Sequence, residues 1–463
     1  MFWIRLCLLS TSLFNVTFYF YQQPVTWDTN TTTVTTPKPL VGANAAPHND
    51  ELIETACYTR LAEIFMVKSY HDELWDEYNV KLSSLHFGSN DGVFRRLPAE
   101  HSEECGWFDP RIRPWYTTPS SVPKDAVLVM DLSQSMNNER LLIAKEAATT
   151  IINTLPVSSR VAVVTFASDA DVLLGGNVLI EAIAENKEQL VKAIEKLEPS
   201  NGTSNLYNAF NLTFGMLSNS MASENSSSRC NSAIILLSDG HVDDGQSEDE
   251  TNMVVSFVEE QKERLSADFS KRTFVFTYTV GEDAEISFAK HFACSTGGIW
   301  RHIGDDETED IVSALSSYNK LFSMGLANEH QGQNVSWIDL HFSKLINRWL
   351  VTAAVPVFDR SVTPYLLLGV AGTGTDLDSL ERIHGENTTK ELYQKWIMKS
   401  SIEGCPSIEP NECQLEALRF LGGGDNATCG VCNNTRPDAS IMPEICPSNA
   451  SLPIDLWHNI DCK

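Results

Sequence analysis

Six side chains with oxygen donors are grouped in three short segments of this chain. The first segment follows the apolar run 125–130, the second precedes a helical pattern that starts near 205, and the third follows the apolar run 232–237. The six residues are Asp131, Ser133, Ser135, Thr203, Ser204 and Asp239. Carboxylate and hydroxyl oxygens are the ligands of hard cations, so the three segments together predict a site for Mg²⁺ or Ca²⁺.

Neutral hydroxyl ligands leave a bound cation electron-poor, so a carboxylate from a partner protein can fill its open position. The D-x-S-x-S loop at 131–135 alone also fits a serine-rich cap for a helix that begins near Asn138. The order of the three segments favours the metal site over the cap. Asp131 is expected to lie exposed at a strand end, so Asp131→Ala should abolish partner capture without unfolding the domain.

The elements that must position these side chains alternate along residues 125–326. Apolar strand patterns such as DAVLVMD, RVAVVTFAS and SAIILLSD are separated by amphipathic helical patterns. Continuous apolar strands between helices indicate a parallel sheet covered on both faces. The predicted fold class is therefore α/β, with a doubly wound, Rossmann-like parallel sheet. Ligands gather at the carboxyl ends of the strands in such a sheet, which brings the three segments to one edge.

With these motifs in this order, residues 123–328 resemble a von Willebrand factor A domain with the metal-ion-dependent adhesion motif. In that family the hydroxyl of the second segment lies six residues before an apolar helix position. Counting back from Phe210, the resemblance implies Ser204 as the ligand, with Thr203 as the alternative. Asn201 opens a sequon beside this loop, and a glycan there would cover the cation. We therefore expect that Asn201 is unmodified or that the site is blocked.

The flanks of this domain carry a second resemblance. FGSNDGVFRRLPA at 87–99 predicts a strand, a turn and a strand, and strand-like runs follow residue 335. With FDPRIRPWY at 108–116, WLVTAAVPVFD and LLLGVAGTGTDLDSL, they resemble an α+β Cache domain, in two parts at 48–122 and 329–400, into which the A domain is inserted. This order is similar to that of the alpha-2-delta auxiliary subunits of voltage-gated calcium channels.

The Cache resemblance implies candidate ligand-binding residues. Arg113 and Trp115 match the residues that bind an amino-acid carboxylate in such domains, whereas Gly374 replaces the expected acid and Asp376 lies two residues later. The alternative is structural: Arg113 stacks on an aromatic face and holds the insertion junction. Resemblance to the channel subunits also offers a Cys230–Cys294 bridge.

Several features predict export. Residues 1–21 read as a secretory signal, with an uncleaved anchor as the alternative, and the Thr/Pro-rich residues 22–47 read as a linker. Residues 401–463 hold six of the ten cysteines that follow Cys7, which predicts a disulfide-stapled segment. Eight sequons are expected to carry glycans in a secreted or cell-surface protein: Asn30, Asn211, Asn225, Asn334, Asn387, Asn426, Asn433 and Asn449.

The net charge and the sequence motifs disfavour some classes of function and favour others. Among 463 residues the net charge is −27, which disfavours nucleic acid as a partner. Protease, hydrolase and phosphate-loop motifs are absent from the sequence, and Cys429 and Cys432 form a C-x-x-C that favours a structural disulfide over a redox role. We expect a non-enzymatic, extracellular, metal-dependent protein-binding protein, with a calcium channel subunit as candidate partner. The alternatives are a secreted adhesin or matrix protein without a channel partner, and a Cache-type small-molecule sensor.

Overall fold

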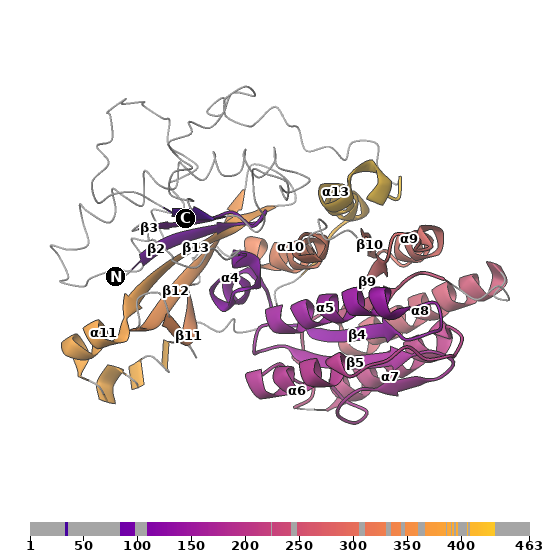
Figure 1. The fold of residues 1–463 in the computed structure, drawn as a ribbon, viewed down its shortest axis with the longest axis horizontal. Helices are drawn as coiled ribbons and strands as arrows, with labels where there is room; N and C mark the ends of the chain where they lie inside the picture. Colours follow the sequence, from indigo (N-terminus) through magenta and orange to yellow (C-terminus); the bar gives the residue numbers. More distant parts are fainter. Residues whose placement is uncertain are drawn as a thin grey trace, which may run out of the picture.

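Two sheets organise the computed structural model (Figure 1). The structure describes residues 33–35, 84–97, 109–223, 225–241, 248–304, 311–329, 335–343, 348–359, 366–385, 387–389, 391–392, 395–396, 405 and 408–430. The predicted signal at 1–21 lies outside these residues. Among the described residues, no helix is both long enough and apolar enough to span a membrane.

The first sheet is mainly parallel and has the order β10-β9-β8-β4-β5-β6, with β7 also paired to β5. Its strands are β4 (Asp125–Asp131), β5 (Arg160–Phe166), β6 (Ala170–Val172), β7 (Ile180–Glu181), β8 (Ser232–Ser238), β9 (Thr273–Val280) and β10 (Ile299–Ile303). Only β6 and β7 run antiparallel to their neighbour β5. The doubly wound parallel sheet expected from the apolar strand pattern is confirmed.

Helices cover both faces of this sheet because successive strand side chains point to opposite sides. On β4, Leu128 and Met130 enter a core with α5, α6 and α10, whereas Val127 and Val129 enter a core with α7 and α8. The helices are α5 (Asn138–Thr154), α6 (Ala184–Glu195), α7 (Leu206–Ala222), α8 (Glu248–Phe269), α9 (Ile286–Ser295) and α10 (Ile311–Glu329). The fully buried β4 is therefore the central strand that carries Asp131 to the sheet edge.

The second sheet is antiparallel and is built from both flanks of the first, in the order β1-β3-β2-β13-β12-β11 (Figure 1). Its strands are β1 (Thr33–Thr35), β2 (Ser84–Ser89), β3 (Phe94–Leu97), β11 (Ser336–Ser343), β12 (Arg348–Asp359) and β13 (Leu366–Asp376). Pairing of β2 with β13 joins segments before and after the parallel sheet. The expected insertion of one sheet between two parts of another is thus present, while the Cache identity of the outer part stays a prediction.

Short helices complete this antiparallel part. They are η1 (Pro110–Ile112), α4 (Pro114–Ser120) and α11 (Leu377–His384). Four residues separate α4 from β4, so the helix stands at the junction of the two sheets. β1 pairs with β3 although it lies in the segment expected as a linker, so that expectation is wrong for Thr33–Thr35. The Thr-Val-Thr sequence suits a strand because β-branched residues favour extended backbone.

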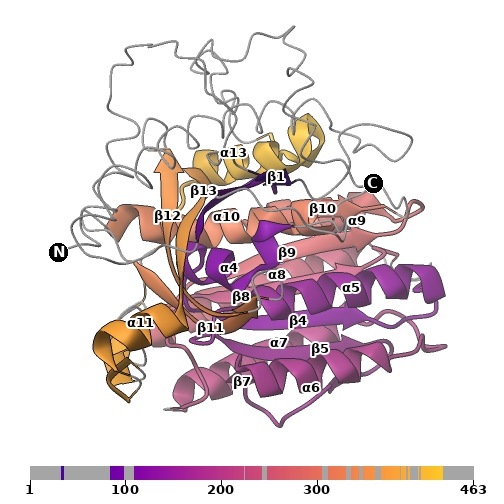
Figure 2. The ribbon, with the colours of Figure 1, turned by 60° about the vertical axis from the view of Figure 1, so that its left-hand side comes forward.

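The described part of the C-terminal segment folds back onto the parallel sheet. Figure 2 shows α13 (Glu412–Gly423) beside α10 and β10, and the turn η2 (Gly424–Ala427) follows it. Two disulfides attach this segment, Cys230–Cys405 and Cys294–Cys429. The expected Cys230–Cys294 bridge is therefore wrong, and Cys429 is not paired within its C-x-x-C. The segment is disulfide-rich as predicted, but these bonds tie it to the parallel-sheet domain and do not staple it to itself.

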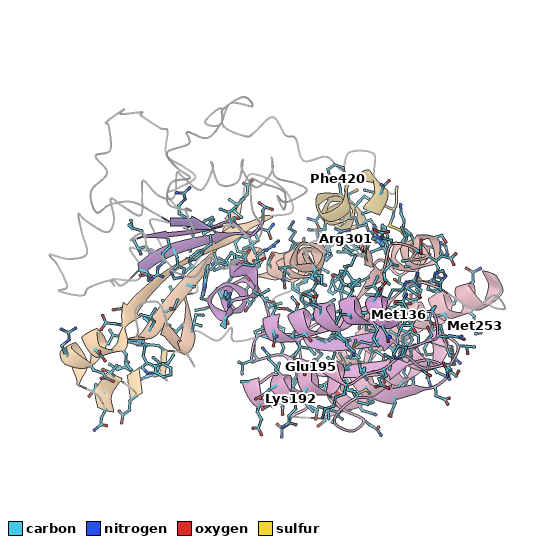
Figure 3. The ribbon with its side chains drawn as sticks, in the orientation of Figure 1. Met136, Lys192, Glu195, Met253, Arg301 and Phe420 are labelled. Carbon is cyan, nitrogen blue, oxygen red and sulfur yellow. A yellow bond between two sulfur atoms is a disulfide. The ribbon has the colours of Figure 1, made fainter. Side chains whose placement is uncertain are left out.

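Buried polar groups reinforce this attachment. Arg419 donates from Nε and Nη2 to the Gly298 carbonyl, at 3.0 and 2.9 Å, and from Nη1 to Glu416 Oε2 at 2.8 Å. Arg301, on β10 next to α13 (Figure 3), donates from Nη2 to the Leu418 carbonyl at 2.8 Å. Ile408, Leu415 and Leu418 of the C-terminal segment join the core formed with α5, α6 and α10.

Candidate metal-binding adhesion site

Two neighbouring strands end at the site. Asp131 is the last residue of β4, and Ser238 is the last residue of the adjacent strand β8, which pairs with β4 up to Met130 and Leu237. Ser238 Oγ donates to Asp131 Oδ2 at 2.7 Å. Asp239 follows directly. The parallel register therefore places both predicted carboxylates at one edge of the sheet.

The loop after β4 joins the two carboxylates. The Ser133 backbone N–H donates to Asp131 Oδ1 at 2.8 Å, which turns the loop back over the strand end. The Ser133 and Ser135 hydroxyl oxygens lie 3.2 Å apart, and Ser135 Oγ donates to Asp239 Oδ1 at 3.2 Å. The helix cap is Asn137, whose side chain accepts from the Arg140 N–H. The serines of the motif are thus turned toward the carboxylates, and the capping role falls to Asn137.

The segment before α7 supplies a further hydroxyl. Ser204 is buried, and its Oγ donates to Asp131 Oδ2 at 3.4 Å. Thr203 is exposed, and its Oγ1 lies 3.3 Å from Ser168 Oγ. The structure brings Ser204 to the cluster and directs Thr203 toward another loop. Asn201, at the start of the sequon, is exposed beside them.

Sequence reasoning missed a positively charged side chain in this cluster, that of Arg140. Arg140 Nη1 forms an ion pair with Asp239 Oδ2 at 2.8 Å and also donates to the Ser135 carbonyl at 3.1 Å. Arg140 lies in the first turn of α5, where the helix dipole disfavours a positive side chain. That unfavourable placement, within one turn of the loop that carries Asp131, is the signal that could have identified it.

Burial changes the electrostatics of the site. Asp131 and Asp239 are both 0% exposed, so the expectation that Asp131 is exposed is wrong. Burial raises the pKa of the Asp131 carboxyl to about 6, and the nearby charge of Asp239 acts in the same direction. Hydrogen bonds from Ser133 and Ser238 favour the ionised carboxylate and oppose this rise. The strand end is polar, yet the loop residues close over it.

The donor set fits a hard divalent cation. The Ser133, Ser135 and Asp239 oxygens form one chain of short contacts, the Ser204 and Asp131 oxygens form a second, and the Ser133 backbone N–H joins the two through Asp131. All of these oxygens belong to carboxyl or hydroxyl groups. Among the described residues no three His, Cys, Asp or Glu side chains are grouped as a metal site. These five side chains are the ones that would hold Mg²⁺ or Ca²⁺.

Comparison with known families decides the nature of this fold. Residues 126–241 match the family model of the von Willebrand factor type A domain. The chain carries a von Willebrand factor type A domain. The match begins at the second residue of β4 and ends just after Asp239, so it contains all the segments of the A-domain site described above.

Calcium channel subunits are similar to about two thirds of this chain. The human voltage-dependent calcium channel subunit alpha-2/delta-4 is 29% identical over 323 residues, which cover 65% of this chain and 26% of that protein. The rat alpha-2/delta-3 subunit is 30% identical over 316 residues, which cover 64% and 27%. The chain thus spans about a quarter of the length of these relatives. Similarity to the alpha-2/delta subunits, predicted from the motif order, is confirmed.

Two solved structures align with this chain at low sequence identity. The von Willebrand factor type A protein from Catenulispora acidiphila aligns with a TM-score of 0.34 and 15% identity, over 55% of this chain and 58% of that chain. BatB from Bacteroides thetaiotaomicron aligns with a TM-score of 0.32 and 17% identity, over 42% and 95%.

Outside the A domain, the three residues proposed for a Cache ligand occupy different places. The Trp115 ring packs against His86 and Phe94, with ring centroids 4.5 and 5.7 Å away, and in the core with Val370 of β13. Asp376 ends β13 six residues after Val370, roughly 20 Å further along the strand. The structure therefore does not bring Asp376 to Trp115.

Arg113 lies immediately before α4, beside Trp115 in the sequence. A Cβ at Gly88 would come within 2.8 Å of the Trp115 ring, so the ring fills a space that a glycine leaves open. This packing favours the structural alternative for Trp115 at the insertion junction.

Proposed function

We propose that this chain is an extracellular protein that binds a partner protein through a divalent cation at the carboxyl edge of its A-domain sheet. One observation carries the proposal: side-chain oxygens from three separate segments meet there. Asp131, Ser135 and Asp239 represent two of these segments, and Ser204 joins from the third within hydrogen-bonding distance of Asp131. Scattered polar loops do not require such convergence.

The chemistry of the donors explains the proposed dependence on a partner. Three of the five donors are neutral hydroxyls, so they solvate a cation without cancelling its charge. When bound, the cation supplies a positive point charge that attracts a carboxylate. The loop after β4 and the segment before α7 hold the hydroxyls in place, and the backbone N–H groups of Ser133 and His241 orient the two carboxylates.

The comparisons support the proposed partner, and the disulfides support the proposed location. The relatives are named as subunits of voltage-dependent calcium channels, so we propose a channel subunit as the partner. Disulfides such as Cys230–Cys405 persist in oxidising compartments, which supports a secreted or cell-surface location. All four predicted glycan acceptors that the structure describes are exposed, as glycosylation requires: Asn211, Asn225, Asn387 and Asn426.

Calorimetry tests the cation site. Mg²⁺ and, separately, Ca²⁺ are titrated into the full chain, its Asp131→Ala variant and the control Asp171→Ala, which changes an exposed aspartate on β6. We expect the wild type and Asp171→Ala to bind a cation and Asp131→Ala to lose binding. Because Asp131 is buried, circular dichroism checks the fold of the variant, and Ser133→Ala provides a second disruption. Absence of cation binding in the wild type would end the proposal.

A second experiment tests the partner. The chain is co-expressed with the pore-forming subunit of a voltage-dependent calcium channel and immunoprecipitated in Mg²⁺ or in chelator. Co-precipitation in Mg²⁺ that is lost in chelator and in Asp131→Ala supports the channel partner. A chain that binds the cation but never the channel would instead favour the adhesin alternative.

A further inference from the structure

Arg140 is held directly on a carboxylate of the proposed cation site. Its Nη1 contacts Asp239 Oδ2 at 2.8 Å and the Ser135 carbonyl at 3.1 Å, so one nitrogen bridges two segments of the site. The other oxygen of Asp239 accepts from Ser135 Oγ and from the His241 N–H. Both oxygens of this buried carboxylate are therefore already engaged, one of them by a positive charge.

The position of the guanidinium is enforced by its surroundings. Gly281 follows β9 with φ of +99°, and a Cβ there would come within 2.8 Å of Arg140 Nε and 2.9 Å of Arg140 Cγ. The arginine stem thus lies in a space that only glycine leaves free. Arg140 is only 13% exposed and stands at a helix start that disfavours its charge. Two unfavourable features, burial and dipole, are offset by its contact with Asp239.

Formal charges show what this contact does. Asp131, Asp239 and Arg140 together carry one net negative charge, and a divalent cation would convert it to one positive charge. Without Arg140 the loaded site would carry no net charge, so only the short-range field of the cation would attract a carboxylate. The guanidinium also repels a cation that approaches Asp239.

We propose that Arg140 is a resident counter-cation of the adhesion site, which competes with the divalent cation for Asp239 and keeps the loaded site positive toward a partner carboxylate. This inference rests on the proposed cation site. A divalent cation has to share Asp239 with the guanidinium or displace the guanidinium, and either event weakens cation binding. Arg140 also has a role in holding the cation-free site together, because Asp239 would otherwise be a buried charge without a counter-ion.

The test compares Arg140→Gln, which keeps a donor but removes the charge, with Arg140→Lys, which keeps the charge. Mg²⁺ affinity of each full chain is measured by calorimetry, and melting temperature is measured in chelator and in saturating Mg²⁺. For Arg140→Gln we expect Mg²⁺ affinity to rise about tenfold. Its melting temperature in chelator should fall by about 5 °C or more, with a larger gain on adding Mg²⁺ than in the wild type.

A carboxylate probe and a control complete the test. Acetate, titrated against the Mg²⁺-loaded proteins and followed by NMR, should bind the wild type and Arg140→Lys more tightly than Arg140→Gln. Arg160→Gln is the control, because Arg160 pairs with Glu181 at the amino end of β5. Its Mg²⁺ affinity should equal that of the wild type.

Equal Mg²⁺ affinity in the wild type and Arg140→Gln, or equal acetate binding by their loaded forms, would overturn the inference while leaving the proposed function intact. Absence of Mg²⁺ binding in the wild type would remove the proposed function itself. If Arg140→Gln fails to fold in both buffers, Gly281→Ala displaces the guanidinium instead. An unchanged Mg²⁺ affinity in a folded Gly281→Ala protein would then count against Arg140.

Discussion

Ser204 Oγ lies 3.4 Å from Asp131 Oδ2, although 73 residues separate the two in the chain. The preceding residue, Thr203, turns the opposite way and meets Ser168. The two adjacent hydroxyls therefore have distinct surroundings. The Ser204 hydroxyl is buried at the strand end, and the Thr203 hydroxyl is exposed and faces the loop that carries Ser168. This difference allows the cation ligand of the second segment to be identified by substitution.

Ser204→Ala should weaken Mg²⁺ binding by about tenfold or more, because it removes one oxygen from the donor set. Thr203→Val should leave the affinity unchanged, since its hydroxyl does not face Asp131. Calorimetry on the two variants, with melting curves in chelator to check the fold, gives the comparison. The reverse ranking would make Thr203 the ligand.

Lys124, directly before β4, predicts an unusual pH dependence of stability. It is completely buried, its Nζ donates to Ser121 Oγ, and it lies 4.8 and 4.5 Å from the ring centroids of Tyr318 and Phe322. Burial lowers the pKa of the Lys124 amine to about 7. The unfolded chain therefore binds more protons than the folded one between about pH 7 and 10.5.

Because of that difference, the free energy of unfolding should rise as the pH increases across this window. The gain should be lost again as the pH falls toward 7. Between pH 7 and 9 the Lys124 amine should raise the free energy of unfolding by an amount on the order of 2 kcal/mol. The two aromatic rings stabilise the buried ammonium and so reduce this gain. Lys124→Met should flatten the pH dependence and be the more stable protein at pH 7. Urea unfolding at three pH values measures this.

The control for Lys124 is Lys192→Met, which changes an exposed lysine paired with Glu188 four residues earlier on α6. Its unfolding should follow the pH dependence of the wild type. A Lys124→Met protein whose stability still rises by the wild-type amount between pH 7 and 9 would show that this amine does not titrate as described.

The Cys294–Cys429 bond should stabilise the A domain through its C-terminal segment. It closes a loop of 135 residues, and bonds that close long loops typically contribute about 2–4 kcal/mol. The double variant Cys294→Ser with Cys429→Ser should melt roughly 5–10 °C lower. It should also be cut sooner by trypsin after Arg419, which the intact protein buries.

Cys432→Ser is the matched change for that experiment, because Cys432 belongs to the same C-x-x-C as Cys429. In this variant the linked Cys294 and Cys429 peptides should still appear by mass spectrometry without reduction. Loss of that linked peptide would mean that Cys429 exchanges partners, and the melting comparison would then report on a different bond.

Asn201 links glycosylation to binding. It is exposed, and it lies three residues before Ser204. We expect that chains able to bind a partner in Mg²⁺ are unmodified at Asn201, since a glycan there would cover the cation site. Peptide mapping of the bound and unbound fractions measures occupancy. Full occupancy together with retained metal-dependent binding would contradict the expectation.

Much of the A domain could be predicted from its sequence because its signals are local. Short apolar runs such as residues 125–131 are typical of buried strands, and helical patterns between them indicate a parallel sheet. The rule that ligands collect at strand ends then brings Asp131 and Asp239 together. Burial was harder to predict, because the closing of loop 131–137 over Asp131 depends on contacts with Asp239 and Ser204 that are distant in sequence.

Other features depend on contacts between residues that are far apart in the sequence, and a local pattern does not specify such contacts. The partners of Cys230 and Cys294 lie 175 and 135 residues away, in a segment whose position is set by the docking of α13. The position of Arg140 in the first turn of α5 was a local signal, but it did not name the partner, Asp239, which is 99 residues distant. Asp376 lies apart from Trp115 for the same reason, since it is displaced along a strand whose register the sequence does not specify.

The presence of Ile408, Leu415 and Leu418 in the A-domain core has a consequence for synthesis. The last helix of the contiguous domain, α10, ends at Glu329, so about eighty further residues leave the ribosome before these core side chains do. During that interval β12 and β13 emerge while one side of α10 still lacks its covering helix. The nascent domain therefore exposes an apolar surface that chaperones can recognise, and the native Cys294–Cys429 bond cannot form until Cys429 has emerged.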